Sequence, residues 1–286
     1  MEKGGIILFE QMQGDNYLGS SRIRGHWLVD YWNRDKTIDS SLEVFKQGAK
    51  YDFLILQKAY WIEYTEKFEG IKILDLCDPD WLGGAVIKRM SNSVDGITTS
   101  SQTLADALKE ITDKPIKFIP DRQDLDFHPF IKKHKGQAKR VCWFGYSHNS
   151  EELYQVVRSL DKLGLKLTVI SNCRPPCKYA DENVQYDWKN PSFDFNKEVT
   201  DCDIVIMPSH INALGKYKSL NKTYTSWALG MPVANSEADL KRFLDADERN
   251  KEAEKRIKEV REKYDIRLSI KEFSNFIKQL KQQRNG

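Results

Sequence analysis

Short apolar runs alternate with helix-forming stretches along this chain, and this alternation restricts its fold more than any other feature. In the first half, the runs are rich in β-branched and aromatic residues, and polar stretches that can be helical separate them. Such alternation is typical of βαβ units, in which a helix connects two parallel strands. The first half therefore predicts an open α/β domain with expected strands at residues 5–9, 51–56, 71–76, 96–99 and 116–119.

The alternation stops and then begins again in the second half. A polar, basic segment at 128–136, bracketed by Pro129 and Gly136, is typical of a linker. We therefore predict an α/β fold of two Rossmann-like domains, residues 1–130 and 137–250, whose parallel sheets face a central cleft. The second domain has expected helices at 193–200 and 221–229 and expected strands at 140–145, 166–170, 184–186, 203–207 and 232–234.

The C-terminal part of the chain, residues 251–286, is expected to be a basic helical segment. Residues 237–264 and 270–282 have helical, charged patterns without a wide apolar face, so we expect them to pack along the outside of the domains or to cross between them. Residues 241–286 contain 14 Lys and Arg against 9 Asp and Glu, whereas the net charge of the whole chain is only +3. This segment could bind phosphates or an anionic membrane surface, or it could be a solvated helical face.

Composition indicates a cytoplasmic protein, with peripheral membrane contact as an option through the basic segment. The apolar run at 6–9 is too short for a signal peptide, and no stretch approaches the ~18 apolar residues of a membrane span. The five cysteines are odd in number, as expected for thiols in a reducing compartment. Cys173 and Cys177 are close in sequence, but no second pair or nearby His completes a zinc site, so we expect no bound metal.

A polar loop leads into the expected helix at 221–229 and carries two lysines, Lys218 and Lys222, around the helix start. A helix N-terminus presents free N–H groups and a partial positive charge, which suit a phosphate. A diphosphate site here is therefore one of two interpretations that the residues alone fit equally well. The alternative is an ordinary helix with a basic, solvated start.

Three segments resemble those of GT-B-fold glycosyltransferases, in particular the glycosyltransferase group 1 family. The first is Ser219-Leu-Asn-Lys-Thr-Tyr-Thr-Ser-Trp-Ala-Leu-Gly-Met-Pro-Val-Ala234, which is similar to the donor-site segment of that family. The others are Val94-Asp-Gly-Ile-Thr-Thr-Ser-Ser101 and Ile119-Pro-Asp-Arg-Gln-Asp-Leu-Asp-Phe-His-Pro129. The resemblance is spread over about residues 5–245 and rests on the order and spacing of these segments.

The resemblance implies that the second half binds a nucleoside diphosphate sugar. Two departures are present: Thr225 stands where many retaining members have a ribose-binding Glu, and Phe144-Gly-Tyr-Ser-His-Asn149 replaces the family's Gly-Arg…Lys-Gly. The phosphate charge would then rest on the two lysines, and a catalytically inactive nucleotide-binding relative stays an alternative. We expect the donor to contact Gly145, Tyr146, Ser209, His210, Lys218, Ser219, Asn221, Lys222 and Thr223.

Two segments of the first half should provide the acceptor side, because ligands of open α/β sheets bind beyond the carboxyl ends of the strands. The loop after the first strand offers Gly19, Ser20, Arg22 and Arg24, and either arginine could bind a phosphate or form a surface ion pair. Asp78 and Asp80 follow the strand at 71–76, where either could accept the proton of an acceptor hydroxyl. In the alternative interpretation, these aspartates cap a helix that starts near Trp81.

The sequence thus predicts a metal-independent glycosyltransferase that transfers a sugar from a nucleoside diphosphate sugar, with a UDP-sugar expected, to an acceptor hydroxyl. The expected acceptor is a saccharide or a lipid-linked saccharide. A DNA-modifying enzyme acting on hydroxymethylated bases is the second possibility, since a basic surface also suits DNA. Asp201-Cys-Asp203 is interpreted as a turn and a strand start, and not as a metal-binding Asp-x-Asp motif.

Overall fold

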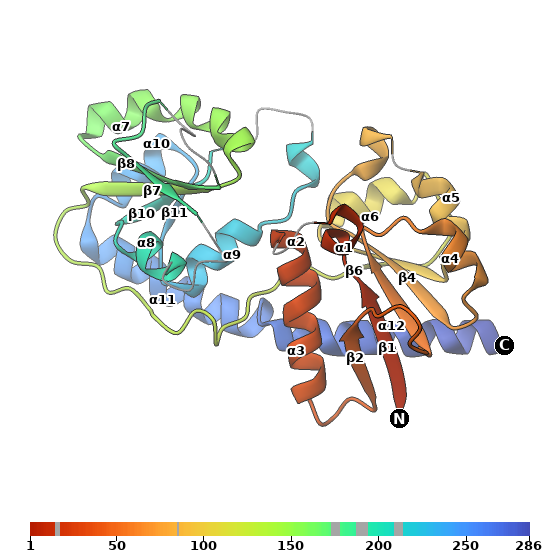
Figure 1. Cartoon of the computed structure of the whole chain (residues 1–286). Helices are drawn as coiled ribbons and strands as arrows, with labels where there is room; N and C mark the ends of the chain where they lie inside the picture. The colour runs from red at the N-terminus through yellow and green to blue at the C-terminus, as the bar shows by residue number, and fades with distance from the viewer. Residues whose placement is uncertain (15–17, 85, 173–177, 187–193, 209–213) are drawn as a thin grey trace. The chain divides into compact units, whose positions relative to one another are not determined.

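The computed structural model describes residues 1–14, 18–84, 86–172, 178–186, 194–208 and 214–286. Contacts divide the chain into two units, each with a parallel sheet and surrounding helices (Figure 1). The first unit comprises Met1–Asp124, Lys216–Ser219 and Asp265–Gly286. The second comprises Leu125–Gly215 and Leu220–Tyr264. The predicted α/β class with two parallel sheets is confirmed.

The sheet of the first unit contains six parallel strands in the order β2-β1-β3-β4-β5-β6. Five of them match predicted strands, and β2 was not predicted. Its sequence is Ser-Ser-Leu-Glu-Val, and only Leu42 is fully buried, so it lacks the apolar run of a central strand. The strands are β1 (Glu2–Ile7), β2 (Ser40–Val44), β3 (Phe53–Gln57), β4 (Ile71–Leu76), β5 (Gly96–Thr99) and β6 (Ile116–Phe118).

Helices cover both faces of this sheet, because successive strand residues point to opposite faces and both sets are apolar. Ile55 and Ile73 pack with the π-helical turn η1 (Arg22–His26) and with α3 (Trp27–Arg34). Leu54 and Leu74 pack on the other face. The helices of that face are α4 (Ile62–Lys67), α5 (Ile87–Asn92) and α6 (Gln102–Leu108), and the Ser101 side chain caps α6.

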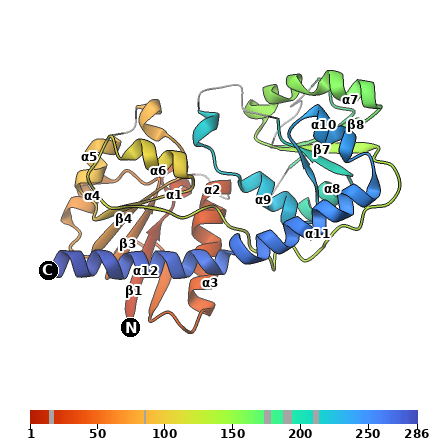
Figure 2. The ribbon, with the colours of Figure 1, turned by 180° about the vertical axis from the view of Figure 1, so that it is seen from behind.

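The C-terminal helix α12 (Ile266–Asn285) is part of the core of the first unit, where it lies along one face of the sheet and against α3 (Figure 2). Arg122 fixes it with two hydrogen bonds of 2.8 Å to the Glu272 carboxylate. The predicted helix exists, but the expectation of a peripheral helix without an apolar face is wrong. Its inward stripe, at helical spacing, consists of Ile266, Ile270, Phe273, Phe276, Ile277 and Leu280.

The second unit repeats the architecture with five parallel strands in the order β11-β10-β7-β8-β9. All five match predicted strands within a few residues. They are β7 (Arg140–Gly145), β8 (Lys166–Ser171), β9 (Glu182–Gln185), β10 (Ile204–Ile206) and β11 (Val233–Ala234). The helices are the 3₁₀-helix η3 (Ser147–Gln155), α7 (Val157–Leu163), α8 (Phe195–Thr200), α9 (Asn221–Ala228), α10 (Glu237–Arg242) and α11 (Ala246–Lys263).

Residues 128–136, the expected linker, belong to the second unit and form hydrogen bonds within it. His128 Nδ1 lies 2.8 Å from Asn196 Oδ1. Lys132 Nζ donates a 2.7 Å hydrogen bond to the Thr200 carbonyl, and His134 is buried. Polar composition at this segment therefore reflects specific hydrogen bonds to the unit that follows it.

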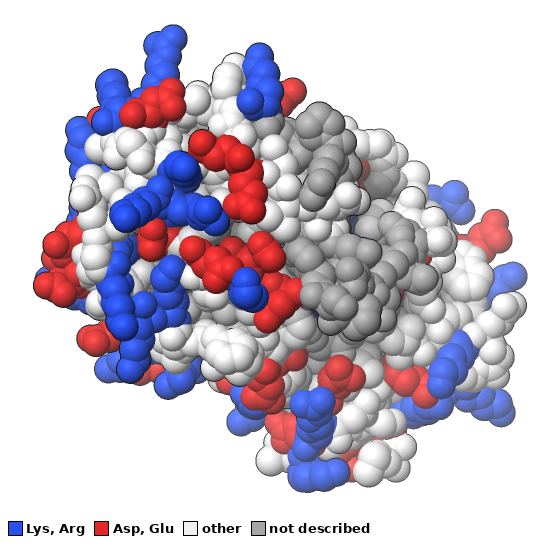
Figure 3. Space-filling view, turned by 60° about the vertical axis from the view of Figure 1, so that its left-hand side comes forward, with Lys and Arg blue, Asp and Glu red and all other residues white. Residues whose placement is uncertain are grey.

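Many of the basic side chains in the C-terminal segment form ion pairs with acidic neighbours. In α11, Arg256 lies 2.7 Å from Glu252 and 2.6 Å from Glu259. Lys and Arg are interspersed with Asp and Glu on the face shown in Figure 3. For α11, this arrangement matches the interpretation as a solvated helical face, whereas α12 also has the buried stripe described above. Within the described residues, no helix is both long and apolar enough to cross a bilayer.

Candidate functional site

The order β2-β1-β3 places the switch point of the first sheet between β1 and β3, where the direction of winding reverses and ligands of open α/β sheets bind. Lys58 follows β3 directly, and its Nζ atom lies 4.7 Å from the ring centroid of Phe9, which follows β1. Of the non-glycine residues that the structure describes, only Lys58 has a positive φ, at 50°. A lysine in this conformation is strained, as residues at functional sites often are.

Lys58 is the centre of a group of charged side chains that we call the Asp78 cluster: Lys58, Tyr60, Asp78, Asp80 and Lys218. Lys58 Nζ lies 2.6 Å from Asp78 Oδ2 and 3.3 Å from Asp80 Oδ1. Lys218 Nζ donates to the other oxygen of Asp78, and the Tyr60 hydroxyl donates to Asp80. The cluster thus joins the predicted catalytic aspartates to one lysine of the predicted donor segment, all within the first unit.

The two aspartates do not cap a helix. The 3₁₀-helix η2 (Asp80–Gly83) begins after Pro79, and no side chain accepts a hydrogen bond from its first N–H groups. The carboxylates are instead directed at cations and at a phenol. This geometry favours a role in binding or proton transfer over the capping interpretation.

Electrostatics keep Asp78 ionised. Burial acts to raise the pKa of its carboxyl, but the Lys58 and Lys218 ammonium groups outweigh burial and hold this pKa below its usual value. Burial, together with Asp80, raises the pKa of Tyr60, so the phenol stays protonated as a donor. At neutral pH, Asp78 is therefore a carboxylate able to accept a hydrogen bond or a proton.

Arg24, a predicted acceptor residue, is an internal residue of the first unit. Its guanidinium forms hydrogen bonds of 2.7 and 2.6 Å to Asp75 and of 2.9 Å to both Asp121 and the Ile119 carbonyl. Asp75 also accepts a 2.6 Å hydrogen bond from Thr98. Because Arg24 is only 4% exposed and four hydrogen bonds hold it, we withdraw it as a substrate-binding residue.

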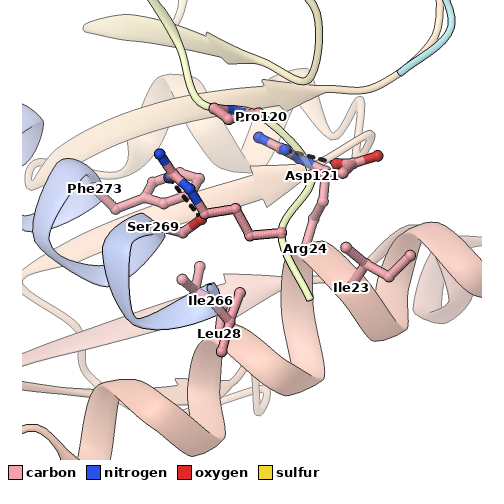
Figure 4. A pocket seen from close by; sticks show the side chains of 9 residues that line it. Ile23, Arg24, Leu28, Pro120, Asp121, Ile266, Ser269 and Phe273 are labelled. Atoms are coloured by element: carbon pink, nitrogen blue, oxygen red, sulfur yellow. Dashed lines mark hydrogen bonds and ion pairs between the residues drawn. The ribbon is translucent and has the colours of Figure 1, made fainter. Parts of the chain in front are cut away.

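The pocket beside Arg24 is too small for a sugar (Figure 4). Its volume is about 10 Å³, close to the space that one water molecule needs. The lining includes Leu28, Arg122 and Phe273. This pocket is therefore a small gap under α12 and does not serve as an acceptor site.

The other predicted acceptor residues lie in the segment after β1. Gly19 and Ser20 belong to the short helix α2 (Gly19–Ser21), and all three of Gly19, Ser20 and Arg22 are partly buried. The guanidinium of Arg22 lies 5.4 Å from the ring centroid of Trp27. Their assignment to the acceptor stays a prediction.

The loop Lys216–Ser219 is fastened to the first unit. Ser219 donates a hydrogen bond to Asp121, the partner of Arg24, and Ser101 donates one of 2.8 Å to the Tyr217 carbonyl. The rings of Tyr217 and Trp81 meet edge-on at 5.7 Å. Since the second unit resumes at Leu220, the predicted donor segment is shared: Lys218 and Ser219 belong to the first unit, and Asn221, Lys222 and Thr223 to the second.

A second group of predicted donor residues gathers at the carboxyl end of β7. This end is the switch point of the second sheet, between β7 and β10. Lys222 Nζ lies 4.8 Å from the ring centroid of Trp143. A Cβ atom at Gly145 would lie only 2.8 Å from that Nζ, so the glycine leaves room for the lysine. Tyr146 follows, 40% exposed and stacked on His148.

Thr225, which replaces the Glu of many retaining enzymes, bonds within its own helix. Its hydroxyl donates to the Asn221 carbonyl at 3.0 Å, and the side chain is buried. The hydroxyl is thereby engaged in the first turn of α9. Ser209 and His210 lie outside the described residues.

Sequence reasoning missed Lys58 and Tyr60. A signal for them was present: they follow a mainly apolar strand, as Asp78 and Asp80 do, and the ends of neighbouring parallel strands meet at one edge of the sheet. The strand order, which reveals the switch point, could not be read from the sequence.

A scan against family models and a search of curated proteins find no match to this chain. Solved structures do match over nearly the whole length. The glycosyltransferase AviGT4 of avilamycin A biosynthesis superposes with a TM-score of 0.63 at 10% identity, covering 98% of both chains. The T4 phage DNA-modifying enzyme β-glucosyltransferase gives 0.58 at 12% identity, over 97% of this chain and 99% of that one.

A third match is the lipopolysaccharide outer core galactosyltransferase WaaB, with a TM-score of 0.59 at 10% identity over 96% of this chain and 98% of that one. At such identities, the comparison concerns architecture. The chain has the fold of the GT-B glycosyltransferases: two parallel-sheet domains with surrounding helices.

Proposed function

We propose that this protein is a glycosyltransferase that moves a sugar from a nucleoside diphosphate sugar to an acceptor hydroxyl. The observation that carries the proposal is the contact between Lys218 and Asp78. It joins a carboxylate suited to proton transfer with a lysine suited to a phosphate, at the carboxyl edge of a sheet whose fold is that of known glycosyltransferases.

In this reaction, the acceptor oxygen attacks the anomeric carbon of the donor sugar. The bond between that carbon and the diphosphate oxygen breaks, and the diphosphate leaves with the bonding electrons. Asp78 takes the proton of the acceptor hydroxyl. Asp80 holds Tyr60 and Lys58 in place around it.

Positive groups of the donor segment stabilise the leaving diphosphate. Lys218 and Lys222 provide two charges, and the positive end of the α9 dipole adds to them. Ser219, Asn221 and Thr223 border these groups. With the lysines supplying charge, the proposed mechanism uses no metal ion.

The proposed donor is a UDP-sugar, and the proposed acceptor is a saccharide or a lipid-linked saccharide in the cytoplasm. UDP-glucose is the substrate named for the T4 enzyme, and WaaB is named as a galactosyltransferase of the lipopolysaccharide outer core. A modified base in DNA is the second candidate acceptor, since the T4 enzyme modifies DNA. That candidate requires strongly salt-dependent binding to duplex DNA.

Thermal-shift measurements with UDP, GDP and ADP, and with UDP-glucose and UDP-galactose, test the donor site. We expect UDP to raise the Tm, and the Lys218→Ala and Lys222→Ala variants to lose most of that rise. Lys216→Ala is the matched control, because this exposed lysine lies on the same loop but contacts the ring of Tyr217. An equal shift in all four proteins would place nucleotide binding elsewhere.

Turnover separates an enzyme from a binding module. Release of UDP from a UDP-sugar, alone or with an acceptor, supports transfer. If UDP-sugars bind but no UDP is released with any of the sugars and acceptors tried, the proposed enzymatic activity is contradicted. The alternative, a catalytically inactive nucleotide-binding relative, then applies.

A further inference from the structure

Five aromatic side chains form a cluster at the surface of the first unit, next to the Asp78 cluster. Trp61 and Tyr64 stack with ring centroids 4.6 Å apart, and Phe45 meets both rings edge-on at 6.2 and 5.4 Å. Tyr51 lies 5.6 Å from Phe45, and Phe68 lies 6.5 Å from Tyr64. We call this group the aromatic platform.

Trp61 is the most exposed ring of the aromatic platform, at 37%. The other four rings are partly buried and pack against the core on one face of the sheet. The platform therefore combines a fixed aromatic base with one exposed ring, and exposed aromatic groups commonly mark binding surfaces.

The aromatic platform adjoins the proposed catalytic group through the chain itself. Trp61 directly follows Tyr60, whose hydroxyl donates to Asp80. Phe45 follows β2 and Trp61 precedes α4, so both stand beyond the carboxyl ends of their strands, the edge at which Lys58 lies. Trp61 therefore stands one residue from the side chain that contacts Asp80.

The charge around these rings does not suit a polyanion. Residues 43–52 and 61–69 contain five acidic and three basic side chains. One of the acidic residues, Glu43, pairs with Lys3. A surface that binds the phosphates of DNA needs an excess of positive charge, which these two segments lack.

We propose that the aromatic platform binds a neutral sugar ring of the acceptor, which stacks its face of C–H groups on Trp61. The inference rests on the proposed function and makes it more specific, because it selects a saccharide over DNA as the acceptor. Sugars present an apolar C–H face and polar edges, so an exposed aromatic ring next to carboxylates and a phenol matches their chemistry.

The test measures binding of free oligosaccharides of two to four hexose or N-acetylhexosamine units by saturation-transfer NMR and calorimetry. The unmodified protein is compared with the variants Trp61→Ala, Trp61→Phe and Tyr154→Ala. Tyr154 is the control, since it is 56% exposed and contacts Tyr179 in the second unit. We expect Trp61→Ala to weaken binding by about tenfold, Trp61→Phe to weaken it less, and Tyr154→Ala to leave it unchanged. Near-native Tm values for the variants show that they are folded.

The inference would be overturned by no binding of any of these oligosaccharides by the unmodified protein, by equal binding by Trp61→Ala, or by duplex DNA binding that depends on Trp61. Self-association that Trp61→Ala abolishes would assign the rings to contact with a second copy, which also overturns it. The UDP thermal shift and UDP release are measured on the same proteins. If the UDP thermal shift and UDP release persist, the proposed transferase activity is supported and only the saccharide site is contradicted. If both are absent, the proposed function itself is contradicted.

Discussion

The Nζ atom of Lys58 lies 2.6 Å from Oδ2 of Asp78. The lysine comes from the end of β3 and the aspartate from the end of β4, two neighbouring strands. The backbone of Lys58 has a left-handed conformation, which is unfavourable for a lysine. Such a conformation persists only where contacts with the surrounding residues hold it in place. Strain and charge are thus concentrated at one point of the sheet edge.

Replacing Lys58 by Met should move the acid limb of the pH–rate profile to higher pH. Lys58 stabilises the Asp78 carboxylate, so its removal raises the pKa of Asp78 and the base is protonated earlier as the pH falls. The measurement is kcat/KM for UDP-sugar turnover against pH. Lys46→Met is the control, since Lys46 is exposed and pairs with Glu43. If the acid limb of Lys58→Met lies at the same pH as that of the unmodified protein, Asp78 is not the general base.

The strain at Lys58 can be measured separately from its charge. Lys58→Ala and Lys58→Gly both remove the ammonium group, but only glycine adopts a φ of 50° without steric cost. We expect Lys58→Gly to be more stable than Lys58→Ala by about 1 kcal/mol in urea unfolding. Equal stability would show that the backbone relaxes in the alanine variant.

Gly145→Ala should weaken UDP binding through Lys222. The new methyl group would lie 2.8 Å from Lys222 Nζ and 2.9 Å from the buried ring of Trp143. Displacing the lysine lowers affinity, and crowding the ring costs about 1–3 kcal/mol of stability. A double-mutant cycle with Lys222→Ala isolates the contact. If Gly145→Ala weakens UDP binding as much without Lys222 as with it, the glycine acts by another route.

Arg24→Met should destabilise the first unit by about 3–5 kcal/mol, because it leaves the buried carboxylates of Asp75 and Asp121 without their cation. Arg34→Met is the control: Arg34 is exposed, so its replacement should cost under about 1 kcal/mol. Urea unfolding monitored by circular dichroism gives both values. A loss as small as that of the control would mean that the carboxylates find other partners.

His134 should make stability depend on pH. Burial, the largest cause, lowers its pKa to about 4. The unfolded chain binds the proton at about pH 6.5, so the free energy of unfolding should fall as the pH decreases from about 6.5 to about 4. The imidazole donates from Nε2 to the Gly230 carbonyl at 2.9 Å, while Nδ1 accepts from Arg249, which leaves no place for a second proton.

His134→Gln keeps a donor for the Gly230 carbonyl without a titrating group. Urea unfolding between pH 4.5 and pH 7 should therefore show a weaker pH dependence in this variant. Parallel curves for the two proteins would assign the dependence to other groups.

The sequence correctly predicted those helices and strands that a pattern of neighbouring residues indicates. β4 and β7 consist mainly of apolar residues, and their bounds match the predicted ones. β2 escaped prediction because an edge strand with one buried residue carries little signal. The apolar stripe of α12 was in the sequence, but its partner, the face of a sheet formed by residues of the first half of the chain, could not be recognised there.

For the site, the sequence identified residue types at strand ends but could not assign their partners. Asp78 and Lys218 were separate candidates, and their contact spans 140 residues. Arg24 looked like a loop arginine because the buried Asp75 and Asp121 that surround it come from distant parts of the chain. Side-chain pairing across such separations is set by the tertiary structure, so local pattern reasoning does not reach it.

The position of α12 has a consequence for synthesis on the ribosome. The six strands of the first unit are translated by Phe118, yet one face of their sheet is closed only when Ile266–Asn285 emerges. All residues of the second unit, which ends at Tyr264, are translated before that helix. The second unit can therefore complete its folding first. Until α12 is synthesised, one apolar face of the N-terminal sheet stays uncovered and can bind chaperones.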